Sequence, residues 1–135
     1  MRRLLLAAGL LAVLAGTSAW TDARSQGTAA PDRFEEESSW AFLKRQVALG
    51  PRPAGSPKSR ELAEILRRSI PNGRFQAVPG GLRNVVGTIP GRNPRRKVVL
   101  GAHYDTKDLP GFVGANDAAS GTAVVRELAR TIKPR

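Results

Sequence analysis

Apolar residues recur at helical spacing in three stretches of the chain. The predicted helices cover residues 34–49, 57–70 and 120–132, and each repeats an apolar side chain every three or four positions. Ser56 is a preferred N-cap residue and Pro57 a preferred first helical residue, so the second helix is expected to begin there. We expect the third helix to be buried. The three apolar faces consist of Trp40, Leu43 and Val47; Leu62, Ile65, Leu66 and Ile70; and Val125, Leu128, Ala129 and Ile132.

Three shorter stretches have the composition of β-strands, and turns rich in Gly and Pro separate them. The predicted strands cover residues 74–78, 84–89 and 97–102. The last contains an uninterrupted apolar run, which is typical of a strand buried on both faces. Residues 50–55 are rich in Gly and Pro and predict a rigid, exposed loop. Two helices, three strands, a loop and a helix indicate an α/β or α+β layered fold.

The N-terminus has the layout of a secretory signal peptide. Two arginines precede an apolar run, and small residues follow it up to Ala19, where we expect cleavage. The run is shorter than the roughly 20 residues that a membrane span needs, although an uncleaved anchor is the alternative. Residues 20–33 are then a flexible leader. The chain is therefore expected to be exported, to the periplasm or the outside, without stable membrane association after cleavage.

Composition narrows the possible chemistry. The chain has 22 Lys and Arg against 11 Asp and Glu, for a net charge of +11. These basic residues, Arg52 among them, fall in separate clusters without interleaved aromatic residues, so we interpret them as a solvated surface and expect no nucleic-acid partner. The chain has no Cys, which excludes disulfides and thiolate metal sites, and a single His, which excludes two-histidine zinc sites within it.

Candidate chemistry lies between the last predicted strand and the last predicted helix. His103 and Asp105 follow the strand, and Asp117 comes from a loop rich in Gly and Ala. Sites in open α/β sheets form at the carboxyl ends of strands, and imidazole with carboxylate suits Zn²⁺. One of His103 and Asp105 could bind the metal while the other orients it. The alternatives are structural: a hydrogen-bonded loop His, an Asx turn at Asp105, and an N-cap at Asp117.

Several segments together resemble the M28 zinc peptidase superfamily, and within it the glutaminyl-peptide cyclotransferases, or glutaminyl cyclases. The resemblance extends from about residue 40 to residue 130, which is nearly all of the chain that follows the expected cleavage site. Lys107 and Phe112–Val113 are cyclase-like details, whereas residues 116–121 are common to many aminopeptidases. The segments that carry the resemblance are His103 to Lys107, Phe112 to Asp117, Glu127 to Arg130, Asn84 to Ile89, Val98 to Leu100 and Leu49 to Ser56.

The resemblance implies a three-layer α/β/α sandwich around a mixed, mainly parallel sheet, with one or two zinc ions at the strand ends. It implies Asp117 as a zinc ligand, His103 as a ligand in the two-zinc peptidases, and Asp105 as the residue that supports the His. The implied substrates are peptide or protein N-termini. A cyclase would convert an N-terminal Gln to pyroglutamate with release of ammonia, and an aminopeptidase would hydrolyse the first residue.

The second half of that implied site is missing from the sequence. The family needs a further acidic ligand, a catalytic Glu and a second His, but only Glu127 and no His follow Asp117. Residues 34–135 are thus interpreted as the N-terminal part of the catalytic domain, inactive by itself. Three hypotheses follow: a cyclase completed in a longer chain, an aminopeptidase completed likewise, or a non-catalytic remnant. A sheet without its later strands would expose an edge and an apolar face, which predicts poor solubility.

Overall fold

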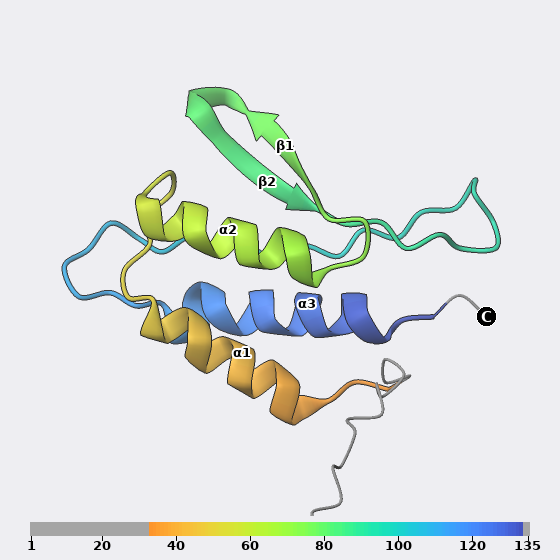
Figure 1. Ribbon diagram of the computed structural model, residues 1–135, viewed down its shortest axis with the longest axis horizontal. Coiled ribbons are helices and arrows are strands. Elements are labelled where there is room, and N and C mark those ends of the chain that lie inside the picture. Colours follow the sequence, from red (N-terminus) through yellow and green to blue (C-terminus); the bar gives the residue numbers. More distant parts are fainter. Residues whose placement is uncertain (1–32, 134–135) are drawn as a thin grey trace, which may run out of the picture.

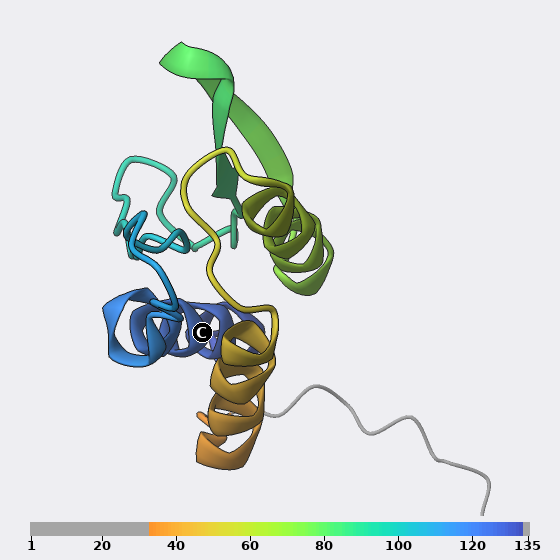
Figure 2. The same cartoon turned by 90° about the vertical axis from the view of Figure 1, so that its left-hand side faces the viewer.

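The computed structural model describes residues 33–133, in which three helices pack around a small core and a β-hairpin projects from them (Figures 1 and 2). The helices are α1 (Glu36–Ala48), α2 (Pro57–Ser69) and α3 (Gly121–Thr131), and α3 contacts both of the others. The buried apolar core consists of Phe42, Leu62, Leu66 and Ala123.

The predicted signal peptide and nearly all of the predicted leader lie outside the described residues. Within residues 33–133, no helix has the length and apolar character needed to cross a membrane.

The predicted apolar face of α1 is wrong by one position. Ser39, Phe42 and Gln46 are the buried residues of this helix, whereas Trp40 is 59% exposed. A polar contact contributes to this rotation, because Gln46 Nε2 donates to the carbonyl of Ala119 at 3.0 Å. The helix therefore turns a polar side chain toward its neighbour, which apolar periodicity does not detect.

The prediction for α2 is confirmed at its start and on its buried face. The Ser56 side chain accepts a hydrogen bond from the Ser59 N–H at 3.1 Å, and Pro57 is the first helical residue. Leu62 and Leu66 are buried, and Ile65 packs against the core from the same helix. Capping and apolar spacing agree here, so the local signal and the packing give the same helix.

The prediction for α3 has the right residues but the wrong buried face. The buried positions are Thr122, Ala123, Glu127 and Thr131, while Ile132 is exposed. The cause is a polar contact with the first turn of α1: Ser38 Oγ donates to Glu127 Oε2 at 2.7 Å, and Arg130 reaches the same oxygen at 2.8 Å. These bonds hold the polar stripe of α3 against α1, and the apolar stripe is only half-buried.

The described sheet is a two-stranded antiparallel hairpin of β1 (Arg74–Val78) and β2 (Leu82–Val86), joined by the short 3-10 turn η1 (Pro79–Gly81). β1 agrees with the prediction, and β2 begins two residues earlier than expected. Gly80 and Gly81 both adopt positive φ, at 79° and 70°, so the turn closes within three residues and pairing starts at once.

The predicted buried strand at residues 97–102 is wrong for the described structure. The segment has no strand partner, and Val98 and Val99 are 89% and 88% exposed. An apolar run becomes a buried strand only where other strands flank it, and no described strand does so. Helices with a small sheet are compatible with an α/β fold, and the three-layer sandwich with a mainly parallel sheet stays a prediction.

Candidate functional site

The three predicted site residues come together in the structure. His103 Nε2 lies 2.8 Å from Asp117 Oδ1, and His103 Nδ1 lies 3.4 Å from Asp105 Oδ1. All three side chains are partly exposed, so water and ligands have access to them. The imidazole is therefore flanked by a carboxylate at each ring nitrogen. The metal-binding role of His103 and Asp117 and the supporting role of Asp105 stay predictions, but their juxtaposition is a property of the fold.

Hydrogen bonds to α3 and the hairpin position the segment that carries His103 and Asp105. Thr122 Oγ1 donates to the carbonyl of His103 at 2.7 Å, which ties the segment to the first turn of α3. The Tyr104 hydroxyl donates to the carbonyl of Arg83 at 2.8 Å, which ties it to β2. Burial raises the pKa of the Tyr104 phenol, and a side-chain hydrogen bond with Ser59 opposes that shift. The phenol therefore remains a donor at neutral pH.

Asp117 lies in a short π-helical segment, η2 (Ala115–Ser120), that precedes α3. Its φ and ψ of −113° and 89° are not helical, and the Asp117–Ala118 peptide bond is cis. Ser120 occupies the N-cap position of α3 and makes no side-chain cap bond. The alternative of Asp117 as the N-cap of the last helix is therefore wrong, and its carboxylate is directed to His103.

Gly114 makes this arrangement possible. It has left-handed dihedrals, with φ 59° and ψ 52°, and its carbonyl accepts from the Ala119 N–H at 3.0 Å. A Cβ atom at residue 114 would collide with the carbonyl oxygen of Asp117. Glycine is thus required both by the backbone conformation and by the close approach.

Lys107 is a further charge beside the site. Its Nζ lies 3.9 Å from Asp117 Oδ2, so the two oxygens of that carboxylate face different partners, the His103 imidazole and an ammonium group. The sequence singled out Lys107 as part of a family pattern but gave no reason to expect it at Asp117. Asp108, the next residue, is exposed.

Arg52 is the structural residue that sequence reasoning missed. It was expected on a solvated surface in an exposed loop, but it is 0% exposed. Its guanidinium donates to four backbone carbonyls, at distances of 2.8 to 3.2 Å, those of Gln46, Gly50, Tyr104 and Val113. The Arg52 side chain thereby holds both backbone segments of the candidate site, one at Tyr104 and the other at Val113.

Hydrogen bonds with Thr106 also hold the Arg52 backbone against the segment that carries His103 and Asp105. The Arg52 N–H donates to Thr106 Oγ1 at 2.9 Å, and the Thr106 N–H donates to the Arg52 carbonyl at 3.1 Å. Desolvation lowers the pKa of the Arg52 guanidinium, and the charge of Asp105 opposes that shift. One signal in the sequence was usable: Pro51 and Pro53 lack N–H groups, so nearby carbonyls need a side-chain donor.

The donor set fits zinc in chemistry, but the described residues make only part of a site. An imidazole nitrogen and a carboxylate oxygen are ordinary zinc ligands. Within residues 33–133, no group of three or more His, Cys, Asp or Glu is arranged to hold a metal ion. Two ligands of a tetrahedral zinc lie about 3.3 Å apart, whereas His103 Nε2 and Asp117 Oδ1 are in direct contact at 2.8 Å.

Comparison with known proteins places the candidate residues in a recognised family region. Residues 84–135 match the family model for Peptidase family M28. A protein named as a probable zinc metalloprotease from Leptosphaeria maculans is 43% identical over 67 residues, which cover 42% of this chain and 15% of that protein. The solved structure of Porphyromonas gingivalis glutaminyl cyclase superposes with a TM-score of 0.49 and 25% identity, covering 74% of this chain and 42% of the other. The chain thus spans only part of each.

Proposed function

We propose that this chain, whose residues 84–135 belong to Peptidase family M28, contributes His103 and Asp117 to a zinc site that acts on the N-termini of peptides. The observation that carries the proposal is the imidazole held between two carboxylates, 2.8 Å from Asp117 and 3.4 Å from Asp105. The relative named as a zinc metalloprotease supports zinc as the metal. A four-coordinate zinc needs ligands besides these two, and other residues would supply them.

Each of the three residues has a distinct role in this proposal. In the zinc-bound form, Asp105, whose Oδ1 lies 3.4 Å from His103 Nδ1, would accept a hydrogen bond from that nitrogen and so leave the Nε2 lone pair for the metal. Asp117 supplies a carboxylate oxygen and part of the negative charge that zinc requires. When bound, zinc acts as a Lewis acid toward a carbonyl or amide oxygen of the substrate. Arg52 fastens the backbone on both sides of this group and keeps the two segments in register.

Lys107 favours the glutaminyl-cyclase chemistry over the aminopeptidase chemistry. A carboxylate that bridges two metal ions uses both oxygens, whereas Lys107 Nζ lies 3.9 Å from Asp117 Oδ2. A positive charge beside that oxygen disfavours a second zinc ion, and a single zinc is what the resemblance implies for the cyclases. In a single-zinc cyclase Asp117 would hold the metal and His103 need not bind it, whereas in a two-zinc peptidase both residues would bind. In that reaction the α-amine of an N-terminal Gln attacks its own side-chain amide carbon, a ring C–N bond forms, and ammonia leaves.

The second candidate is an aminopeptidase of the same family. The relative from Leptosphaeria maculans favours it, because that protein is named as a metalloprotease. The two reactions share the substrate's free amino terminus and differ in the bond that breaks. We place either activity outside the cytoplasm, since residues 1–19 have the layout of a signal peptide.

Zinc titration of the full chain tests the first part of the proposal. We expect calorimetry on metal-stripped protein to detect zinc binding, with affinity reduced at least tenfold by Asp117→Asn and by His103→Gln. Asp108→Asn is the matched control, because it removes an equal charge from an exposed neighbouring position. Equal zinc affinity in wild type, Asp117→Asn and His103→Gln would show that the cluster does not bind the metal.

The reaction is tested on the protein expressed from its own gene. Ammonia release from a peptide that begins with Gln supports the cyclase, and release of the anilide from an aminoacyl-anilide supports the aminopeptidase. Lys107→Gln adds a direct check, because we expect it to raise the number of zinc ions bound per chain above that of wild type. An unchanged number would contradict the argument from Lys107.

A further inference from the structure

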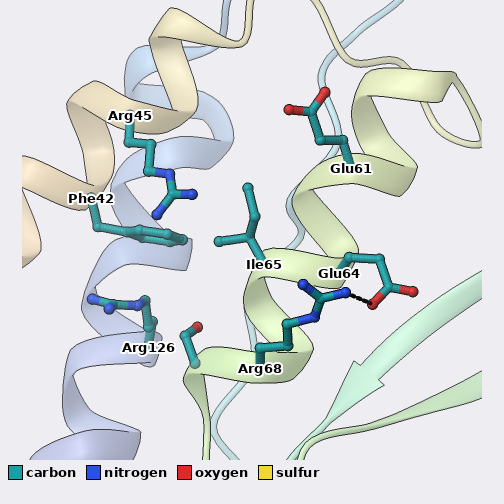
Figure 3. A pocket seen from close by; sticks show the side chains of 8 residues that line it. Phe42, Arg45, Glu61, Glu64, Ile65, Arg68 and Arg126 are labelled. Atoms are coloured by element: carbon teal, nitrogen blue, oxygen red, sulfur yellow. Dashed lines mark ion pairs between the residues drawn. The ribbon is translucent and has the colours of Figure 1, made fainter.

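A pocket of about 560 Å³ lies between the three helices, lined by residues from α1, α2 and α3 (Figure 3). Phe42 on α1 and Ile65 on α2 face each other across it and form apolar walls. None of the three candidate zinc-site residues lines this pocket. It is therefore a second feature with its own chemistry.

Two arginines flank the aromatic wall. Figure 3 shows Arg45 of α1 and Arg126 of α3 on either side of the Phe42 ring. The guanidinium carbon of Arg126 lies 4.4 Å from the ring centroid, and the side chain is only 18% exposed. Its buried Nε has no hydrogen-bond partner among the described residues. A desolvated guanidinium with an unused donor is costly unless an acceptor arrives.

The nearby carboxylates do not neutralise these arginines. Glu127 Oε2 is 3.7 Å from Arg126 but is already bonded by Arg130 and Ser38 at 2.8 and 2.7 Å. Desolvation lowers the pKa of the Arg126 guanidinium, and the charges of Arg130 and Arg45 lower it further, while Glu127 opposes them. Within residues 33–133, no carboxylate lies within 4 Å of the Arg45 side chain.

The two carboxylates on the α2 side of the pocket are also engaged. Glu64 pairs with Arg67 at 3.1 Å and with Arg68 at 3.7 Å, and Glu61 pairs with Lys58 at 2.9 Å. The α1 and α3 side of the pocket therefore keeps an excess of positive charge beside an aromatic ring, and the α2 side supplies an aliphatic side chain.

From this arrangement we propose that the pocket binds a small amphipathic carboxylate, a short alkyl or aryl chain that ends in one carboxyl group. The carboxylate accepts hydrogen bonds from Arg45, the positive charge of Arg126 on the other side of the ring adds to its attraction, and the apolar chain lies between Phe42 and Ile65. A bare inorganic anion leaves the apolar walls uncovered. A neutral apolar molecule leaves the arginines without an acceptor.

Calorimetry of the full chain with octanoate tests the proposal, together with the Ile65 δ-methyl signal in a methyl-labelled NMR spectrum. We expect a dissociation constant below about 1 mM for octanoate, and a shift of the Ile65 signal that saturates with the same constant. Acetate, which has the charge without the chain, and octanol, which has the chain without the charge, should each bind at least tenfold more weakly. Charge-assisted hydrogen bonds are strong enough to give a discrimination of that size.

Substitutions of Arg45 and Arg126 test whether these two arginines attract the carboxylate. Arg45→Gln is on an exposed position and is expected to fold normally while reducing octanoate affinity about tenfold; Arg126→Gln should do the same. Lys44→Gln is the matched control on the same helix, because Lys44 is exposed and does not line the pocket. The proposal is overturned if octanol binds as tightly as octanoate, if Arg45→Gln leaves the affinity unchanged, or if Lys44→Gln reduces it equally. It is also overturned if an octaglutamate peptide shifts Ile65 and octanoate does not, which would identify an acidic protein segment as the partner.

Discussion

Replacing Arg52 with Met should destabilise the fold more than any exposed arginine substitution in this chain. Arg52 is 0% exposed and donates to carbonyls of α1, of its own loop and of the two segments beside the candidate site. Met has a similar length and no donor, so the carbonyls lose their partner while most of the volume stays filled. The backbone bonds between Arg52 and Thr106 remain, because they do not use the Arg52 side chain.

The magnitude follows from the number of acceptors left behind. A buried acceptor without a partner costs about 1–3 kcal/mol, and four carbonyls lose the guanidinium. Water reaches some of them, and removing a desolvated cation returns part of the loss. Because these two effects offset much of the sum over four carbonyls, we expect the free energy of unfolding to fall by about 3–5 kcal/mol. That is a large share of the roughly 5–15 kcal/mol that stabilises a typical domain.

Urea denaturation followed by circular dichroism at 222 nm measures the effect. Arg52→Lys keeps the charge but has fewer donors and no planar fork, so it should recover only part of the lost stability. Arg60→Gln, at an exposed position on α2, is the surface control and should change the unfolding free energy by less than about 0.5 kcal/mol. If Arg52→Met unfolds within 0.5 kcal/mol of wild type, the carbonyl cluster does not hold the two segments together.

Four further outcomes are expected. Gly114→Ala should lower the unfolding free energy by about 2 kcal/mol or more, because the new Cβ would collide with the Asp117 carbonyl and residue 114 has a left-handed backbone conformation. Urea denaturation measures this effect, and an unchanged midpoint would contradict it. Ser56→Ala should cost about 1 kcal/mol through the lost cap of α2, with Ser56→Asp restoring most of it. Tyr104 is the only tyrosine in the sequence, so ultraviolet titration measures its ionisation alone. Burial raises its pKa above the ordinary value near 10, so the folded state holds the proton more tightly than the unfolded state. The free energy of unfolding should therefore fall as pH rises through that range, and Tyr104→Phe should remove this pH dependence. The exported protein should begin at Trp20 by N-terminal sequencing, and an intact Met1 in the mature protein would contradict cleavage.

Local signals sufficed where local and tertiary requirements agree. Ser56 and Pro57 start α2 as predicted, and β1 spans the predicted residues, since a cap and a glycine turn act through neighbouring backbone. The resemblance to the M28 superfamily is confirmed by the match over residues 84–135. These features depend on a few residues close together in the chain.

Burial could not be predicted because it depends on what lies opposite. In α1 the periodicity selected Trp40, whereas contacts of Gln46 and Ser38 with the α3 region set the actual face. Periodicity likewise treated Arg52 as surface, although its partners are carbonyls far along the chain. The apolar run at 97–102 is exposed for the corresponding reason, since no described strand pairs with it. The expectation of poor solubility stays a prediction, which light scattering would measure.

The candidate site shows why its residues were predictable and its geometry was not. Residue type and position at a strand end were enough to select His103, Asp105 and Asp117. The sequence left Asp117 with two possible roles, a zinc ligand or the N-cap of the last helix, because a carboxylate after a glycine-rich loop suits both. The left-handed conformation of Gly114 and the extended dihedrals of Asp117 turn the carboxylate away from the helix end and toward His103. The proposed metal-binding role of Asp117 therefore depends on Gly114 as directly as on its own carboxylate.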